Sequence, residues 1–163
     1  MSKVRVVLAG LGVRGRHWAE VLTRSSRCEI VAYADPNPSA HERMKEHYGE
    51  RPVYASAEEA LAAISDVGAL VLANPPIGRD SQIKAAAERG IPMLIEKPLA
   101  LDVSEAAHLV SIAETAHVPL MVGLNFRYLG VTQTTMRLLR EETVGKAEFA
   151  FSSSVTVTAT GQI

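Results

Sequence analysis

The stretch "MLIEKPLALD", residues 93–102, places a charged pair directly after an apolar run. Glu96 and Lys97 end the run, and Pro98 restricts the backbone that follows. A partly desolvated lysine at the end of a buried strand is suited to holding a hydroxyl group and assisting its proton transfer. The alternative is an exposed Glu96–Lys97 ion pair, which would contribute little stability. We favour the first interpretation, in which Lys97 is a catalytic residue.

A glycine pattern lies near the start of the chain, where "GLGVRG" at 10–15 fits G-x-G-x-x-G. In such a loop Gly10 permits a tight turn, Gly12 lets a pyrophosphate approach the backbone, and Gly15 lets the following helix pack closely. The free N–H groups at the helix start attract phosphates. The predicted phosphate-binding residues are Gly10, Leu11, Gly12, Val13, Arg14 and Gly15. Alternatively, the glycines only turn the chain, and Arg14 and Arg16 are solvated charges.

An acidic residue, Asp35, ends the next expected strand, 20 residues after Gly15. A carboxylate at this position hydrogen-bonds the ribose hydroxyls of a dinucleotide and repels a 2′-phosphate. Pro36 follows it, where an arginine or serine would favour the phosphate. We therefore expect NAD in preference to NADP, although Arg14 and Arg16 leave NADP open. Asp35 could otherwise be a plain loop acid.

Alternating strand-like and helix-like segments must position these residues. Apolar, β-branched runs predict strands, and segments with helical periodicity between them predict helices. The strands are expected at 4–10, 29–35, 52–56, 69–76, 91–98 and 118–128, the last running into a loop. The helices are expected at 15–25, 39–49, 79–90 and 102–116, with a further helix after Ser56. This alternation predicts an α/β fold, a doubly wound parallel Rossmann sheet of strand order 3-2-1-4-5-6. Ser56 with Glu59 and Asp102 with Glu105 have capping-box spacing. Trp18, Val21 and Leu22 are expected on one buried helix face.

The sequence changes character after residue 128. A helix is expected at 131–145, and "KAEFAFSSSVTVTATGQI" at 146–163 alternates as one long strand does. We therefore divide the chain into a dinucleotide-binding domain, 1–125, and the truncated start of an α+β substrate and dimerisation domain, 126–163. An unpaired edge strand favours association, so residues 146–158 are expected to mediate a homo-oligomer.

The motifs taken together resemble the N-terminal half of the Gfo/Idh/MocA oxidoreductases. "GLGVRG", Asp35, "ANPP" at 73–76, "EKPLA" at 96–100 and "VGLNFRY" at 122–128 follow one another in that family's order and spacing. The resemblance spans about residues 3–150. It implies hydride transfer between a nicotinamide and a hydroxyl of a sugar, polyol or related compound. A dinucleotide-binding domain without turnover is the alternative.

The resemblance also implies roles for individual residues. Lys97 matches the lysine beside the nicotinamide and substrate, and Glu96 matches an acid that shapes the cofactor pocket. Asn74 and Pro75 match the turn that passes the two riboses, and Arg127 matches an arginine at the domain junction. The chain departs from the family at Arg79, where a histidine is usual, and in its length, because members are about twice as long and carry a catalytic histidine in their second domain.

The composition restricts the remaining classes. Of 163 residues, 47% are hydrophobic and 21% charged, with a net charge of −1, which disfavours nucleic acid and acidic membranes as partners. The single cysteine, Cys28, predicts a reducing, cytoplasmic setting. No segment reaches the roughly 18 apolar residues of a membrane span. The histidines, such as His41 and His47, lack the spacing and partners of a metal site.

Overall fold

The computed structural model describes residues 2–143 and 145–146, and the chain divides into two compact units, Met1–Leu124 and Asn125–Ile163. The strands of the first unit are β1 (Val4–Ala9), β2 (Cys28–Ala34), β3 (Val53–Tyr54), β4 (Ala69–Leu72), β5 (Met93–Ile95) and β6 (Leu120–Val122). Its helices are α1 (Val13–Arg24), α2 (Pro38–Tyr48), α3 (Ala57–Ala63), α4 (Arg79–Glu88) and α5 (Val103–Thr115). Helices and strands alternate throughout the unit.

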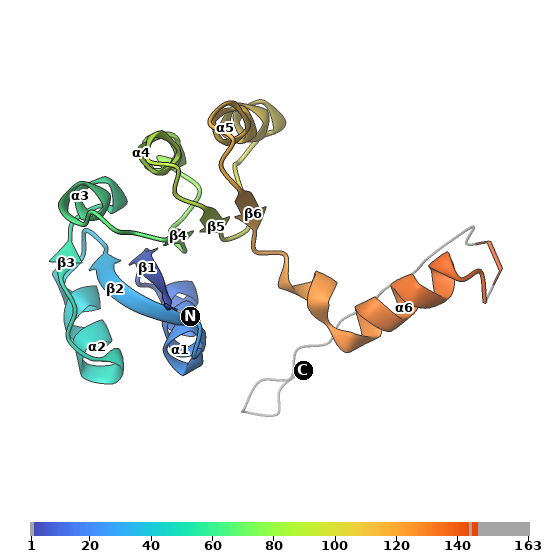
Figure 1. The fold of residues 1–163 in the computed structure, drawn as a ribbon, viewed down its shortest axis with the longest axis horizontal. Helices are drawn as coiled ribbons and strands as arrows, with labels where there is room; N and C mark the ends of the chain where they lie inside the picture. The colour runs from blue at the N-terminus through green and yellow to red at the C-terminus, as the bar shows by residue number, and fades with distance from the viewer. Residues whose placement is uncertain (1, 144, 147–163) are drawn as a thin grey trace. The chain divides into compact units, whose positions relative to one another are not determined.

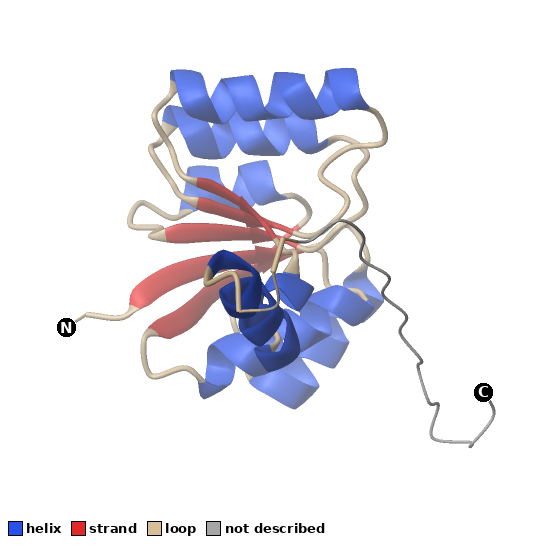
Figure 2. Cartoon of the chain, turned by 90° about the vertical axis from the view of Figure 1, so that its right-hand side faces the viewer, coloured by secondary structure: helices blue, strands red, loops and turns tan. Residues whose placement is uncertain are grey.

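The six strands form one sheet in the order β3-β2-β1-β4-β5-β6, and every neighbouring pair is parallel. This confirms the predicted doubly wound sheet. Helices α1 and α2 lie on one face, and α3, α4 and α5 lie on the other (Figures 1 and 2). The chain therefore reverses its winding direction between β1 and β4, where a crevice opens at the carboxyl ends of the strands.

The hydrophobic core has two layers, one on each face of the sheet. Alternation along β1 sends Val7 and Ala9 toward α3, α4 and α5, and Val6 and Leu8 toward α1 and α2. All four side chains are buried. A strand buried on both faces must be apolar at every position, which explains why these strands read as continuous apolar runs.

Two helices begin with the capping boxes expected from the sequence. At α3, Ser56 Oγ accepts from the Glu59 N–H at 3.2 Å, and Glu59 Oε2 accepts from the N–H of Ala55, the residue before the cap, at 3.1 Å. At α5, Asp102 accepts from the Glu105 N–H at 2.8 Å. These bonds satisfy N–H groups that a helix start leaves unpaired, and they confirm both predictions.

One residue that was expected on the buried face of the first helix, Val21, is exposed in the structure. Helix α1 buries Gly15, Ala19 and Leu22, and Val21 is 58% exposed. The small residues Gly15 and Ala19 bring this stripe closest to the sheet, and Val21 lies about 100° around the helix from Leu22. Trp18 is half-buried, and its indole belongs to the site described below.

The second unit begins with a 3-10 helix at Asn125–Tyr128, followed by α6 (Gly130–Arg140). The predicted sixth strand, which runs into a loop within 118–128, is present as β6: it ends at Val122, and the Leu124 N–H donates back to the Val122 carbonyl at 2.7 Å. The predicted strand at 146–163 and the predicted contact at 146–158 lie outside the described residues apart from Lys146.

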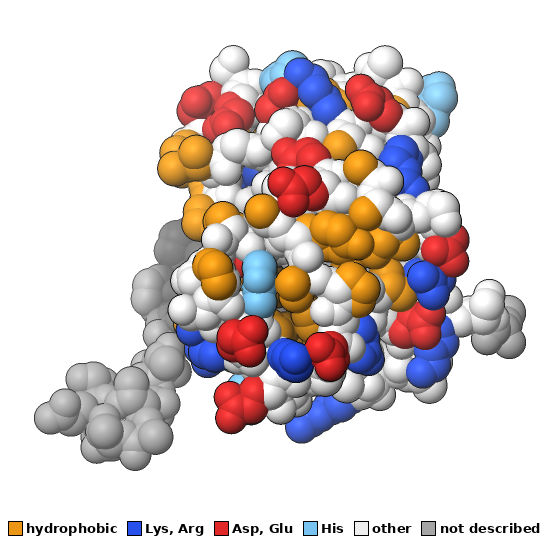
Figure 3. Space-filling view, turned by 90° about the vertical axis from the view of Figure 1, so that its left-hand side faces the viewer, with side chains coloured by type: hydrophobic (Ala, Val, Ile, Leu, Met, Phe, Trp, Pro, Cys, Tyr) orange, Lys and Arg blue, Asp and Glu red, His pale blue; other side chains and the backbone are white. Residues whose placement is uncertain are grey.

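Across the described part of the chain, no helix is long and apolar enough to cross a membrane. Figure 3 shows the face over α2, β3 and α3, where acidic and basic side chains are interspersed. This mixture agrees with the net charge of −1.

Candidate functional site

The predicted chemical groups of the first unit meet at the carboxyl edge of the sheet. The glycine loop follows β1, Asp35 follows β2, Asn74 lies two residues after β4, and Glu96 follows β5. Because parallel strands all end at this edge, residues far apart in the sequence become neighbours.

The three loop glycines have different reasons to be glycine. Gly10 has a φ of 83°, and a Cβ there would collide with the backbone of Asn74. A Cβ on Gly15 would collide with the carbonyl oxygen of Gly10. A Cβ on Gly12 would meet no described atom within 4 Å. Gly10 and Gly15 are thus required by the fold, whereas at Gly12 the space beside the backbone is open to a ligand.

The carboxylate of Asp35 joins the glycine loop to the start of α2. Its Oδ2 accepts from the Leu11 N–H at 2.7 Å, and its Oδ1 accepts from the Asn37 N–H at 2.9 Å. His41 Nε2 donates to the Asp35 carbonyl at 2.6 Å. The sequence predicts the acid at this position but does not reveal that it also holds the loop in place.

Glu96 is 2% exposed and is bound by two side chains of α1. Its Oε1 accepts from Arg14 Nη2 at 2.6 Å and from Trp18 Nε1 at 2.9 Å. Burial acts to raise the pKa of Glu96, but the hydrogen bonds from Arg14 and Trp18 and the charge of Arg14 outweigh it and hold the pKa below its ordinary value. Glu96 therefore pairs with Arg14 and not with Lys97, so the interpretation of an exposed Glu96–Lys97 pair is wrong, as is that of Arg14 as a solvated charge. Arg16 is exposed, as expected of a solvated charge.

Arg79 is buried at the start of α4, with 1% exposure. It donates to the carbonyl oxygens of Asn74 at 2.7 Å, Leu99 at 3.0 Å and Pro98. Burial lowers the pKa of Arg79, and the charges of Glu96 and Glu105 oppose that shift. One guanidinium thus ties the turn after β4 to the segment that follows Lys97.

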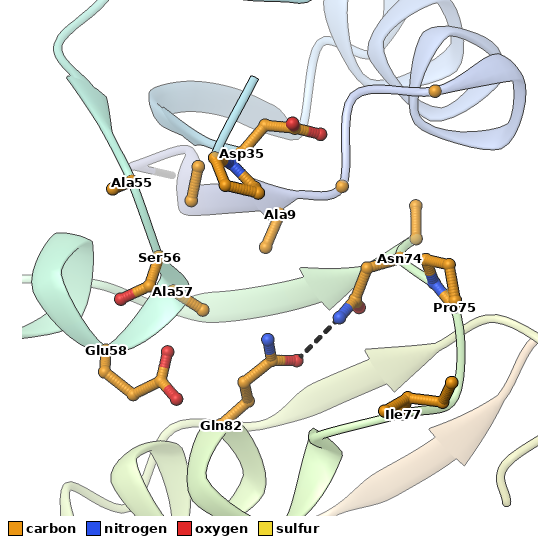
Figure 4. A pocket seen from close by; sticks show the side chains of 15 residues that line it. Ala9, Asp35, Ala55, Ser56, Ala57, Glu58, Asn74, Pro75, Ile77 and Gln82 are labelled. Atoms are coloured by element: carbon orange, nitrogen blue, oxygen red, sulfur yellow. Dashed lines mark hydrogen bonds between the residues drawn. The ribbon is translucent and has the colours of Figure 1, made fainter. Parts of the chain in front are cut away.

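Two cavities lie against these groups. The larger, of about 640 Å³, extends from Asp35 to Glu58 and Gln82 (Figure 4). The smaller, of about 320 Å³, is lined by Arg14, Glu96 and Lys97. Both are lined by the same four residues around the glycine loop: Gly12, Ala73, Asn74 and Pro75. A long ligand that crosses the backbone at Gly12 would reach into both.

The cavity walls contain buried acceptors without a partner among the described residues: Glu58 Oε2 and Asn74 Oδ1 in the larger cavity, and Glu96 Oε2 in the smaller. Buried polar atoms are normally hydrogen-bonded. No side chain caps the N-terminus of α1, which leaves its first N–H groups available to an anion. These features fit a dinucleotide, which carries phosphates beside donor groups on its sugars and bases.

Two predicted site residues, Lys97 and Arg127, lie outside the network of buried contacts. Lys97 is exposed at the rim of the smaller cavity, and its peptide bond to Pro98 is cis. Arg127 lies in the second unit, so its role at the domain junction stays a prediction. Among residues 2–143 and 145–146, no three histidine, cysteine or acidic side chains group as metal ligands.

The sequence interpretation missed four functional candidates: Trp18, Glu58, Arg79 and Gln82. The sequence predicts Trp18 as a core residue, and Arg79 stands out in it only as a departure from the family pattern. Glu58 and Gln82 are 24 residues apart and line one cavity only when α3 and α4 pack side by side. An arginine at an expected helix start, where the helix dipole disfavours a positive charge, is the one signal that the sequence offers.

Comparison with known proteins identifies the fold's relatives. Residues 4–124 match the family described as "Oxidoreductase family, NAD-binding Rossmann fold" of the Gfo/Idh/MocA type. The chain is 28% identical to D-apiose dehydrogenase of Paraburkholderia graminis over 145 residues, which are 89% of this chain and 38% of that protein. It thus spans less than half of that relative's length.

Two solved structures resemble the chain closely. One is scyllo-inositol dehydrogenase from Lactobacillus casei with NAD(H) and scyllo-inositol (TM-score 0.82, 18% identity, 88% of this chain and 43% of that one). The other is a 3-ketoreductase from Actinomadura kijaniata with TDP-benzene and NADP (TM-score 0.76, 25% identity, 89% and 44%). The glycine loop, the strand order and the family match agree. The chain belongs to the Gfo/Idh/MocA oxidoreductase family, and its first unit has that family's NAD-binding Rossmann fold.

Proposed function

We propose that the chain binds a nicotinamide dinucleotide across its glycine loop and contributes the cofactor half of an oxidoreductase acting on a sugar, polyol or related hydroxy compound. The observation that carries this proposal is the open space at Gly12, between two cavities and beside the uncapped start of α1. In this arrangement Gly10, Leu11, Val13, Arg14 and Gly15 surround the phosphates. The cofactor, when bound, supplies the acceptor for a hydride.

Asp35 sets the preference between the two cofactors. Its carboxylate lines the larger cavity, where it can accept hydrogen bonds from ribose hydroxyls. A 2′-phosphate at the same position would face the carboxylate charge. The guanidinium of Arg14 is paired with Glu96 and does not offset that charge. These contacts favour NAD over NADP.

Lys97 is the residue we assign to the substrate. It lines the smaller cavity, where its ammonium can donate a hydrogen bond to a substrate hydroxyl and so orient the carbon that gives up the hydride. Glu96, buried below it, fixes α1 against the end of β5 through Arg14 and Trp18. Asn74 and Pro75 form the wall between the two cavities. The second unit, with Arg127, is assigned to the start of a substrate and dimerisation domain.

A second candidate is dinucleotide binding without turnover. It is favoured by the exposure of Lys97, because none of the described residues hydrogen-bonds or pairs with its side chain. A catalytic lysine normally requires partners that orient it and exclude water. Both candidates share the dinucleotide site and differ only in the reaction.

Calorimetric titration with NADH and NADPH tests the shared part, and turnover of NAD with a panel of inositols and aldoses separates the two candidates. We expect NADH to bind more tightly than NADPH. Turnover that is lost in Lys97→Met, with NADH affinity unchanged, would support the oxidoreductase. Binding without turnover on any substrate would favour the second candidate, and failure of both dinucleotides to bind would contradict both.

The predicted homo-oligomer through residues 146–158 and the predicted cytoplasmic setting belong to the same proposal. The family relatives act on small molecules, and the lone Cys28 is suited to a reducing compartment. Light scattering of the chain at several concentrations tests the oligomer. A mass that stays at 17.5 kDa would contradict it.

A further inference from the structure

The larger cavity ends, away from Asp35, at two polar side chains on neighbouring helices (Figure 4). Glu58 lies in the first turn of α3, and Gln82 lies in the first turn of α4. Neither residue belongs to the glycine loop or to the Glu96 network. They therefore lie where one end of a ligand that crosses the backbone at Gly12 would be placed.

Glu58 presents an acceptor whose position is fixed. Its Oε1 accepts from Ser81 Oγ at 2.6 Å, which holds the carboxylate. Its Oε2 is buried and has no partner among the described residues. A buried carboxylate oxygen without a donor is costly, so a ligand group that donates a hydrogen bond here would bind favourably.

Gln82 presents a donor beside it. Its Oε1 accepts from Asn74 Nδ2 at 3.0 Å. This bond leaves Gln82 Nε2 as a donor, which Figure 4 shows directed into the cavity, and none of the described residues accepts from it. The end of the cavity thus offers one acceptor and one donor on adjacent helices.

The surrounding wall is apolar and suits a flat ring. Ala55, Ala57 and Ile77 line the same cavity. Small side chains at Ala55 and Ala57 leave space for a ring, and Ile77 is 75% exposed, so ring contact would cover apolar surface that now faces water.

We propose that Glu58 and Gln82 recognise the adenine base, Glu58 Oε2 accepting from its exocyclic 6-amine and Gln82 Nε2 donating to its N1. The inference rests on the proposed dinucleotide site and adds selectivity for the base to it. Adenine carries a donor at position 6 and an acceptor at position 1. Hypoxanthine carries the reverse, an acceptor oxygen at position 6 and an N–H at position 1, and would face both side chains with mismatched groups.

The test compares NADH with its hypoxanthine analogue, which has the same sugars, phosphates and nicotinamide. Dissociation constants are measured from the fluorescence of the bound reduced nicotinamide. For the wild-type chain we expect the analogue to bind about tenfold or more weakly, as for a site whose polar groups lose their matched partners.

The Glu58→Gln variant should reduce that ratio to about threefold or less. Ser81 can still donate to the amide oxygen, which turns the amide NH2 toward the cavity, where it can donate to the 6-oxygen of hypoxanthine. Glu88→Gln, which changes an exposed glutamate of α4, is the matched control and should keep the wild-type ratio. Gln82→Met provides a second variant, expected to weaken NADH binding more than binding of the analogue.

Each outcome decides a separate point. Equal binding of the two dinucleotides to wild type would overturn the base recognition and leave the dinucleotide site standing. A ratio unchanged in both Glu58→Gln and Gln82→Met, with both variants folded by circular dichroism, would overturn the assignment to these residues. Absence of binding by either dinucleotide would overturn the proposed function together with this inference.

Discussion

Replacing Glu96 by glutamine should destabilise the first unit at neutral pH. The change keeps the size of the side chain and an oxygen for Arg14 and Trp18, but it removes the negative charge that both donors face at 2.6 and 2.9 Å. It also places an amide NH2 in a buried position where no described residue offers an acceptor.

The expected loss of stability follows from the hydrogen bonds that Glu96 accepts. Hydrogen bonds to a charged group contribute about 1.5–3 kcal/mol, against about 1 kcal/mol for neutral ones. The side chain of Arg14 is 42% exposed, so water can hydrate the guanidinium and compensate part of the loss of its charged partner. We therefore expect the free energy of unfolding to fall by about 2 kcal/mol at pH 7.

The difference between wild type and Glu96→Gln should also depend on pH. The pKa of Glu96 in the folded chain lies below its ordinary value, which is about 4.3 in an unfolded chain. Such a carboxylate contributes its full stabilisation above the unfolded pKa, and the contribution is lost as the pH falls through the folded pKa. The difference should thus be constant from pH 7 to about 5 and shrink below about 4.3.

Urea unfolding followed by the fluorescence of Trp18, the single tryptophan of the chain, measures this directly. Glu20→Gln is the control, because its ion pair with Arg24 is exposed and should contribute less than about 0.5 kcal/mol. A Glu96→Gln variant as stable as this control at pH 7, or a difference that grows as the pH falls, would refute the reasoning.

Three further predictions test the glycine loop, Asp35 and Arg79. Gly12→Ala should keep the free energy of unfolding within about 0.5 kcal/mol of wild type but weaken NADH binding at least about tenfold. Gly15→Ala should lower the free energy of unfolding by about 1–3 kcal/mol. Equal losses of stability in the two variants, measured by urea unfolding, would contradict this distinction. Asp35→Ser should release the Leu11 N–H, cost about 1–3 kcal/mol of stability, and lower the ratio of NADH to NADPH affinity in titration; an unchanged ratio would contradict the ribose assignment. Arg79→Lys should destabilise the chain by about 2–3 kcal/mol, because one ammonium group cannot replace a planar guanidinium that donates to several carbonyl oxygens. A thermal melt like that of wild type would argue against the role of Arg79 in joining the two loops.

The strand order and the glycine loop could be predicted from the sequence because each depends on local patterns. Continuous apolar runs specify buried parallel strands, and glycine spacing specifies a turn into a helix. Asp35 was predictable for the same reason, since it ends a strand at a set distance from the loop. The end of β6 was not, because the apolar pattern continues through Leu124 and Phe126 while the backbone turns.

The contacts that complete the site could not be predicted. Arg14 and Glu96 are 82 residues apart, and their pairing depends on the distance between α1 and β5 after packing. Arg79 departs from the expected residue at its position, but only the structure gives it three carbonyl partners from two loops. Glu58 carries no motif at all. Such residues acquire their roles from tertiary neighbours, which composition and periodicity do not encode.

The central claim is that a dinucleotide lies across Gly12 with its nicotinamide half beside Glu96. Trp18 donates to Glu96, which lines the smaller cavity, so a reduced nicotinamide bound there lies within energy-transfer range of the single indole. Titration of the chain with NADH, with excitation of Trp18, tests this most directly. We predict saturable quenching of Trp18 with sensitised nicotinamide emission, abolished in Gly12→Ala. A folded wild-type chain that shows no saturable transfer would contradict the claim.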